Sequence, residues 1–281
     1  MSGKTSAYVL TVSSQKGGSS KTSTVAALGA CLAEDGFDVV LVDADVQADM
    51  TVSFGFDSTG LPLERTLGGV LYNTLERIDG PGIGDIAVDI TDEVFPQPPK
   101  GRLRLVAANR ELARVVKLLE ADQFGLTVMS DALSGLDCDV CIIDTPPTLG
   151  THVLGALAAA DGVLTPVAPD VRAFAGAERI WEEVDRLAAH GYGNPEPVGV
   201  FLTQLDPRTK LGRDAEKYMH TFKGKVPILE ATRRTVRVSE AALEGKPITI
   251  YDPDHQVSQA YRSIAREVAK HVRRKRNARA A

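Results

Sequence analysis

The segment that most constrains this chain is a loop of small residues ending in Lys-Thr, at residues 16–22. It follows a β-branched apolar run and precedes a helical pattern, so it joins a strand to a helix. The backbone N–H groups of such a loop hold phosphates, while Lys21 can reach the β- and γ-phosphates and Thr22 can bind Mg²⁺. A strict phosphate loop has glycine where this chain has Gln15 and Ser20. Taken alone, the heptapeptide is better explained as a plain Gly/Ser turn.

Two further apolar runs end in carboxylates. Residues 38–42 lead into Asp43 and Asp45, and residues 139–143 lead into Asp144. In an open parallel sheet, ligands bind outside the carboxyl ends of the strands, which is where these acids fall. One such acid can simply cap the next helix. Three acids on two strands, beside a Lys-Thr loop, favour a magnesium–nucleotide site.

The strands and helices that we expect alternate along the chain. The strands lie near residues 7–13, 38–43, 103–107, 139–144, 163–167 and 198–202, and the helices near 21–35, 110–120 and 174–189. This alternation predicts an α/β fold, a doubly wound, mostly parallel sheet with helices on both faces. No sharp break in composition separates two domains, so residues 1–281 are expected to form one domain with a basic helix or tail at about 259–281. Residues 44–101 read as a variable region.

Composition agrees with this fold and excludes a membrane-spanning chain. Hydrophobic residues make up 43% of the 281 residues and aromatic residues only 5%, which suits aliphatic strands covered by Ala-rich helices. No apolar run approaches membrane-spanning length, and the N-terminus lacks the pattern of a signal peptide. We therefore expect a cytosolic protein.

The three cysteines and the distribution of charge each bear on the expected function. Cys31, Cys138 and Cys141 are odd in number, and the last two are expected to face opposite sides of a strand, so neither a disulfide nor a metal or redox role is expected.

Residues 259–281 hold eight Lys or Arg against one Glu, although the whole chain has a net charge of −5. An acidic body with a basic tail suggests a polyanionic partner, and a solvated terminal helix explains it equally well.

Together these segments resemble the ParA family of partition ATPases, which have a deviant Walker A loop with an extra lysine. The resemblance covers most of the chain, and residues 156–164, 202–209 and 239–248 are closer to ParA than to MinD or the nitrogenase iron protein. The loop begins at residue 16, so the resemblance implies the small form of ParA, without an N-terminal helix-turn-helix domain.

The resemblance implies an ATP hydrolase that uses Mg²⁺ and is slow without a partner. The implied ATP-binding residues are Lys16, Gly17, Gly18, Ser19, Ser20, Lys21, Thr22 and Ser23. The implied metal-binding residues are Thr22, Asp144 and Asp43, and hydrogen bonding to loop amides is the alternative for Asp43. Lys16, Lys21 and Asp45 are the implied catalytic residues: Lys16 matches the lysine that reaches across a dimer, and Asp45 the carboxylate that positions the attacking water.

Several residues depart from the family pattern, and two of them bear on the nucleotide. Ser20 replaces the glycine before the phosphate-binding lysine, which costs about 1–2 kcal/mol if that position needs a positive φ. Arg233 stands where the family usually has a proline, in the loop over the adenine. Both departures lie where a nucleotide would bind, so they bear on its affinity and turnover.

The resemblance also implies nonspecific binding to double-stranded DNA. The candidate residues are Arg233, Arg234, Arg237, Arg262, Arg266, Lys270, Arg273 and Arg274. Contacts from Arg and Lys to phosphates give affinity without sequence preference and weaken steeply with salt. An ordinary basic surface is the alternative explanation.

We therefore expect an ATPase that segregates DNA, of a plasmid, a chromosome or a phage genome, in the cytoplasm on the nucleoid. It would form a homodimer with ATP, coat DNA and be stimulated by a ParB-like partner. One alternative is a MinD-like membrane-associated ATPase, for which Ile264, Val268 and Val272 would form the apolar face of an amphipathic helix, although the tail lacks bulky anchors. A nucleotide-binding scaffold with little turnover, suggested by Ser20, is another.

Overall fold

A computed structural model describes residues 7–280, without the side chains of residues 279 and 280, and contains one seven-stranded sheet. The strand order is β3-β4-β2-β5-β1-β6-β7, and every neighbouring pair is parallel except β3 and β4. The strands are β1 (Tyr8–Val12), β2 (Asp38–Asp43), β3 (Val88–Asp89), β4 (Arg102–Val106), β5 (Val140–Asp144), β6 (Gly162–Val167) and β7 (Glu196–Leu202). The prediction of a doubly wound, mostly parallel α/β sheet is confirmed.

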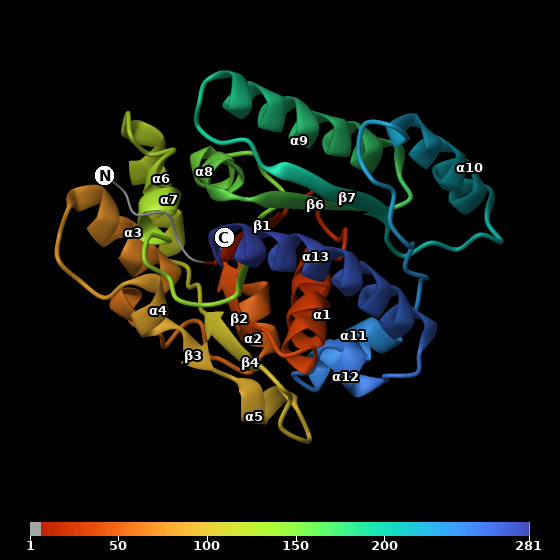
Figure 1. The fold of residues 1–281 in the computed structure, drawn as a ribbon, viewed down its shortest axis with the longest axis horizontal. Helices are drawn as coiled ribbons and strands as arrows, with labels where there is room; N and C mark the ends of the chain where they lie inside the picture. The colour runs from red at the N-terminus through yellow and green to blue at the C-terminus, as the bar shows by residue number, and fades with distance from the viewer. Residues whose placement is uncertain (1–6, 281) are drawn as a thin grey trace.

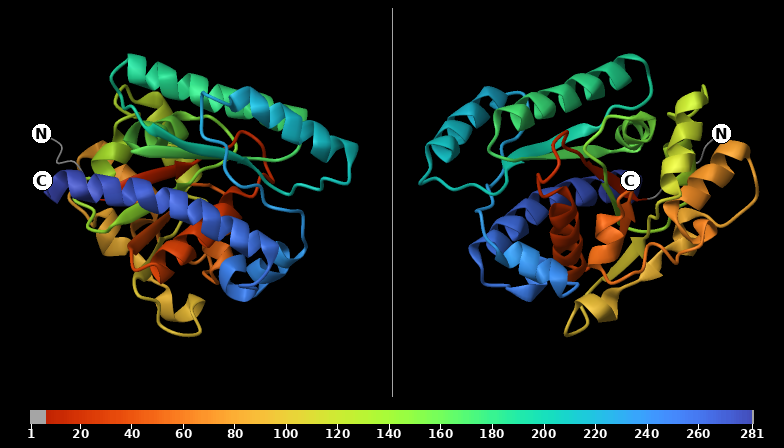
Figure 2. Two further views of the ribbon diagram at one scale, coloured as in Figure 1. Left: turned by 45° about the vertical axis from the view of Figure 1, so that its right-hand side comes forward. Right: turned by 180° about the vertical axis from the view of Figure 1, so that it is seen from behind.

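Helices cover both faces of the sheet (Figures 1 and 2). One face packs against α1 and α13, the other against α3 and α6 to α9, and α10 lies beside β7. The helices are α1 (Lys21–Glu34), α2 (Asp49–Ser53), α3 (Leu67–Glu76), α4 (Ile83–Ile86), α5 (Thr91–Val94), α6 (Leu112–Ala121), α7 (Val128–Ala132), α8 (Thr151–Ala159), α9 (Val171–Ala189), α10 (Lys210–Met219), α11 (Arg237–Leu243), α12 (Ile248–Tyr251) and α13 (Gln256–Ala280), with 3₁₀ turns at Leu63–Arg65 and His220–Phe222. The expected elements lie within a few residues of those observed. The variable region, in contrast, contains α2 to α5 and the edge strand β3, which the sequence did not indicate.

The central strands are apolar throughout because helices bury them from both sides. Within each strand, alternate residues serve opposite faces: Leu10 and Leu41 pack toward α1, whereas Val9 and Val40 pack toward the other layer. Helix α1 lies so close to the sheet that a Cβ atom at Gly29 would stand 2.7 Å from Cδ2 of Leu41. The helix that begins at the loop is therefore held firmly against β2.

Helix α13 buries its apolar face against α1 and the sheet (Figure 1). Ile264, Val268 and Val272 are fully buried in the same apolar cluster as the α1-facing strand residues. In this fold, the face that a membrane-inserting helix would need is part of the core. Within residues 7–280, no helix is long and apolar enough to cross a bilayer.

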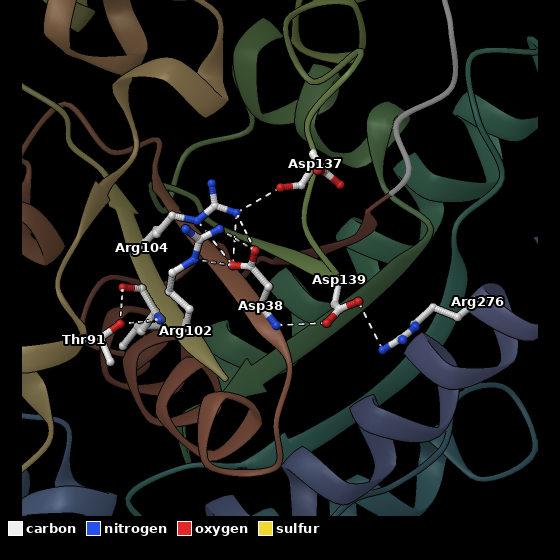
Figure 3. Close-up of polar contacts among 8 residues, drawn as sticks. Asp38, Thr91, Arg102, Arg104, Asp137, Asp139 and Arg276 are labelled. Carbon is white, nitrogen blue, oxygen red and sulfur yellow. Dashed lines mark hydrogen bonds and ion pairs between the residues drawn. The ribbon is translucent and has the colours of Figure 1, made fainter. Parts of the chain in front are cut away.

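Acidic residues at the amino ends of the strands form a network with basic residues (Figure 3). Arg102 and Arg104 of β4 both bind the carboxylate of Asp38 at the start of β2. The backbone N–H of Asp38 donates to Asp139 at 2.9 Å, and Asp139 also pairs with Arg276 of α13 at 3.1 Å. The amino ends of the strands are thus linked to the C-terminal helix by ion pairs.

Other basic residues of α13 make similar ion pairs at the amino ends of the strands. Arg274 and His271 both contact the carboxylate of Glu196 at the start of β7. Lys275 contacts Asp161, directly before β6, and the backbone carbonyl of Ala7. Much of the basic charge near the C-terminus is therefore balanced by acids of the same chain. The side chain of Arg279 lies outside the described residues.

The expectation that Cys138 and Cys141 face opposite sides of a strand is wrong. β5 begins at Val140, so Cys138 precedes the strand and its alternation does not apply. Both side chains belong to one apolar cluster, and burial raises the pKa of the Cys138 thiol to about 12. All three cysteines, which lie within the described residues, are free thiols.

The buried face of α13 predicts a large loss of stability when it is truncated. Ile264→Ala should lower the free energy of unfolding by about 2–5 kcal/mol, because it leaves a cavity beside α1. The control Gln259→Ala, at an exposed position of the same helix, should change it by less than about 0.5 kcal/mol. Urea unfolding monitored by circular dichroism measures both, and similar values for the two variants would contradict the packing of α13 in the core.

Candidate nucleotide site

The strand order brings the predicted site residues to one place. β5 lies between β1 and β2, and the pairing register sets both Val12 and Asp43 beside Asp144. The loop that follows β1 and the acids that follow β2 therefore converge on the carboxyl end of β5. This is the position where open α/β sheets bind ligands.

The loop reaches α1 through two residues with positive φ. Gly18 has a φ of 72°, and Ser20, the N-cap of α1, has a φ of 63°. The Ser20 carbonyl accepts hydrogen bonds from the Thr24 N–H at 2.9 Å and the Thr24 hydroxyl at 2.7 Å, which starts the helix. The position of Ser20 thus requires the left-handed conformation that glycine adopts without strain.

Residues after β7 hold the loop from the outside. The Thr203 hydroxyl donates to the Ser19 carbonyl at 3.2 Å, and Nε2 of Gln204 donates to the Gly18 carbonyl at 2.7 Å. The same Nε2 lies 3.0 Å from Oγ of Ser20. Sequence reasoning did not assign these two residues. The available signal was their place directly after the buried strand β7, because the other site residues also follow the carboxyl ends of strands.

Thr22 and Asp144 form a pair of oxygen ligands suited to Mg²⁺. The Thr22 hydroxyl donates to Oδ2 of Asp144 at 2.7 Å. The other oxygen, Oδ1, is buried and has no hydrogen-bond partner among the described residues. A buried carboxylate oxygen left in this way beside a hydroxyl suits a hard cation, which takes oxygen ligands. The residues present therefore fit a magnesium ion that accompanies bound phosphates.

Burial shifts the protonation of both charged groups in the site. It lowers the pKa of the Lys21 ammonium, although Asp144 and Asp45 oppose this shift. It also raises the pKa of Asp144, and the neighbouring Asp43 raises it further. Bound phosphates would stabilise the charged lysine, and a bound cation would stabilise the charged carboxylate. Ligands of opposite charge would thus offset the cost of burying these two groups.

Asp43 is fully buried, and the chain itself uses both of its oxygens. Oδ2 accepts from the Thr51 N–H at 2.9 Å and from the Thr51 hydroxyl at 2.7 Å, while Oδ1 accepts from the Asp45 N–H at 3.2 Å. Burial raises the pKa of Asp43 to about 6, and these hydrogen bonds oppose the shift. The contacts to the Asp45 amide and to Thr51 of α2 favour the alternative that Asp43 hydrogen-bonds its own chain, and the magnesium role stays a prediction.

Asp45 and Lys16 lie at the outer part of the site. Asp45 is half-buried, and its Oδ1 accepts from the Gln47 N–H at 2.9 Å. Nζ of Lys16 lies 3.2 Å from Oδ2 of Asp170, the N-cap of α9. Within one subunit Lys16 thus contacts another element of its own chain, and its reach into a partner subunit stays a prediction.

The predicted DNA-binding residues divide into paired and exposed groups. Arg237 pairs with Asp252 and Glu240, and Arg262 pairs with Glu34. With Arg274 bound to Glu196 and Lys270 to Glu267, four of the eight candidates pair with acids of the same chain. Exposed candidates are Arg234, Arg266, Lys270, which pairs with Glu267, and Arg273, whose guanidinium lies 5.3 Å from the Phe37 ring centroid. Arg233 is half-buried beside the loop.

Comparisons with known proteins agree with this geometry. Residues 7–195 match the family model described as an AAA domain. The sporulation initiation inhibitor protein Soj of Bacillus subtilis is 33% identical over 270 residues, which span 93% of this chain and 98% of that protein. The chromosome partitioning protein ParA of Caulobacter vibrioides is 33% identical over 267 residues, 92% of this chain and 93% of that protein. A structure of a McdA variant from Cyanothece in complex with ATP has a TM-score of 0.78 at 20% identity, and the match covers 94% of this chain and 97% of that chain, which shows a shared fold.

The left-handed backbone at Ser20 predicts an order of stability among its variants. Ser20→Gly should be more stable than Ser20→Ala by about 1 kcal/mol, because relief of strain outweighs the extra entropy of the unfolded glycine chain. Both variants lose the contact with Gln204, so their difference reports the backbone alone. At Ser23, inside α1, the order should reverse by about 1 kcal/mol. Urea unfolding measures all four, and the same order at both positions would contradict the strain at Ser20.

Proposed function

The chain belongs to the ParA family of partition ATPases, and on this premise we propose that it hydrolyses ATP with Mg²⁺ to drive the segregation of DNA. The observation that carries the proposal is the Thr22–Asp144 hydrogen bond, with an unpartnered Asp144 oxygen, among the described residues, beside the buried Lys21. A hydroxyl, a carboxylate and a lysine at the start of a helix are what phosphoryl transfer requires around a nucleotide. Residues 1–281 would act as a single ATPase domain.

Each residue of the site has a defined part in this proposal. Lys21 and the start of α1 bind the β- and γ-phosphates, and Thr22 with Asp144 holds the magnesium ion, which neutralises phosphate charge when bound. Asp45 orients the attacking water from the edge of the site. Phosphoryl transfer depends on positioning and charge more than on a strong base, so no further acid or base is required.

Dimerisation and DNA binding extend the proposal beyond one subunit. Lys16 would release Asp170 and reach the nucleotide of a second subunit, so that ATP favours a homodimer. The dimer would bind double-stranded DNA without sequence preference through the exposed arginines, in the cytoplasm on the nucleoid. A ParB-like, centromere-bound protein would stimulate an otherwise slow hydrolysis and so release the DNA.

Two alternatives are weaker on specific grounds. The MinD-like alternative would need the apolar face of α13 at a bilayer, and that face is buried against α1. The scaffold alternative relies on Ser20, but the loop adopts the left-handed turn despite the serine side chain. Turnover therefore distinguishes the scaffold from the ATPase.

Single-turnover hydrolysis tests the proposed activity without a partner protein. With protein in excess over Mg²⁺-ATP and random duplex DNA present, the wild type should release phosphate, and Asp45→Ala should bind ATP yet release phosphate about 100-fold more slowly or worse. Asp49→Ala, at the next and exposed acid, should resemble the wild type. Absence of release from the wild type would favour the scaffold, and an unimpaired Asp45→Ala would remove Asp45 from the mechanism.

DNA binding should be ATP-dependent, independent of sequence and sensitive to salt. Arg234→Ala and Arg266→Ala should each weaken binding to all duplexes alike and reduce the slope of log affinity against log salt by about 1 to 2 in a dimer, whereas the exposed Arg114→Ala on α6 should not.

Lys16→Ala should form no ATP-induced dimer in light scattering and should lose the gain from avidity. Filter binding at several salt concentrations measures this, and ATP-dependent retention that persists in Lys16→Ala would contradict the cross-subunit role.

A further inference from the structure

Two basic side chains near the end of α13 share one carboxylate. Glu196, the first residue of β7, accepts a hydrogen bond from the Tyr8 hydroxyl at 3.0 Å. Nδ1 of His271 lies 2.5 Å from the same oxygen, Oε1, and the guanidinium of Arg274 contacts the other oxygen, Oε2. A carboxylate oxygen only accepts hydrogen bonds, so Nδ1 of His271 carries a proton and donates it. The second nitrogen of the ring is then the one that gains or loses a proton.

The charges of the other members of this group are fixed near neutral pH. Burial raises the pKa of the Tyr8 phenol, and Glu196 raises it further, so Tyr8 stays a neutral donor. Burial also acts to raise the pKa of Glu196, but the hydrogen bonds that this carboxylate accepts outweigh burial and lower it. Arginine is always charged, and histidine is the side chain whose charge ordinarily changes between pH 5 and 8. His271 is therefore the variable member.

The other charged residues in this part of α13 have contacts of their own. Arg273 lies with its guanidinium 5.3 Å from the centroid of the Phe37 ring. The others form ion pairs with acids of the chain, one of which is drawn in Figure 3: Lys270 with Glu267, Lys275 with Asp161, and Arg276 with Asp139. Each pair is neutral as a unit. The balance of charge at the Glu196 carboxylate is therefore set mainly by its own two basic partners.

Protonation of His271 upsets this balance. While the imidazole is neutral, Glu196 and Arg274 cancel each other. A protonated imidazole adds a second positive charge, and Nη2 of Arg274 lies only 3.2 Å from Nδ1 of His271. Like charges at this separation repel each other. The side chain of Arg274 is 64% exposed, compared with 20% for His271, so Arg274 is the partner that can turn toward solvent.

We propose that the end of α13 is a proton-controlled surface for the phosphates of duplex DNA, which Arg274 binds once His271 is protonated. A phosphate beside Arg274 would balance the positive charge that Glu196 cannot. By linkage, protonation and phosphate binding then favour each other. A duplex suits this surface better than a bilayer does, because the apolar face of α13 is in the core and has no side chains to insert. The proposal rests on the proposed DNA binding and states when one part of the surface becomes active.

Filter binding of a random-sequence duplex at about pH 8 and about pH 6, which bracket the ordinary titration of histidine, tests the proposal. ATP and Mg²⁺ are saturating, and the ionic strength is the same at both pH values. On acidification, the wild type should gain about tenfold more affinity than His271→Gln, which corresponds to a change of about one unit in one pKa. Glutamine keeps a donor for Glu196 and cannot take up the charge. At the lower pH the wild type should also have a steeper salt dependence, by about 1 to 2 in a dimer.

Three further variants assign the effect to this group. His271→Lys carries a lasting positive charge, so at about pH 8 it should bind the duplex as the wild type does at about pH 6. Arg274→Gln should lose the gain on acidification. The same change at an exposed histidine outside α13, His220→Gln, should retain it. Circular dichroism at both pH values establishes that each variant is folded.

The outcomes separate this proposal from the proposed function. An equal gain on acidification in the wild type and in His271→Gln would overturn the proposal alone. A folded His271→Lys that binds no better than the wild type at the higher pH would do the same. So would a gain confined to vesicles of phosphatidylglycerol, because it would assign the surface to lipid headgroups. If the wild type binds no duplex at either pH, the proposed DNA binding fails and this proposal fails with it.

Discussion

The position of β5 between β1 and β2 is the constraint on which the rest of this site depends. It brings the end of β5 beside the end of β1, from which the phosphate loop departs, and beside the end of β2. The Thr22–Asp144 hydrogen bond forms across 122 residues of sequence only because of this order. The sheet therefore positions these residues, and the left-handed backbone at Gly18 and Ser20 leads the loop into α1.

Helix α13 contributes to the structure in two ways. Its apolar face fills the core beside α1, and its basic residues near the C-terminus pair with acids at the amino ends of the strands. Part of the basic charge near the C-terminus is thus neutralised by acids of the same chain. Arg266 and Arg273 stay exposed on the same helix, so any polyanion-binding surface on α13 is narrower than the count of basic residues suggests.

Much of the fold and the nucleotide site followed from local sequence patterns. Apolar β-branched runs located the strands, and the Lys-Thr loop with Asp144 located the site, because each signal lies within a few residues. Contacts between residues far apart in the sequence could not be predicted from such local patterns. The contact between Lys275 and Asp161 spans 114 residues of sequence. Asp43 accepts hydrogen bonds from Thr51, which lies on the short helix α2, and this helix has no clear sequence pattern. An amphipathic pattern in α13 likewise indicated a buried face without saying whether protein or lipid would cover it.

The contact between α1 and α13 links the phosphate loop mechanically to the C-terminal helix. The hydroxyls of Thr24 and Tyr261 lie 3.3 Å apart near the loop end of α1, and Glu34 binds Arg262 at the opposite end. Ten residues separate Thr24 from Glu34 along α1, so these two ties stand about 15 Å apart along its axis. Both ties come from one turn of α13, so α1 is held at its two ends against the same part of that helix. A tilt of α1 would therefore carry this turn of α13 with it, and the exposed Arg266 lies on the next turn of the same helix.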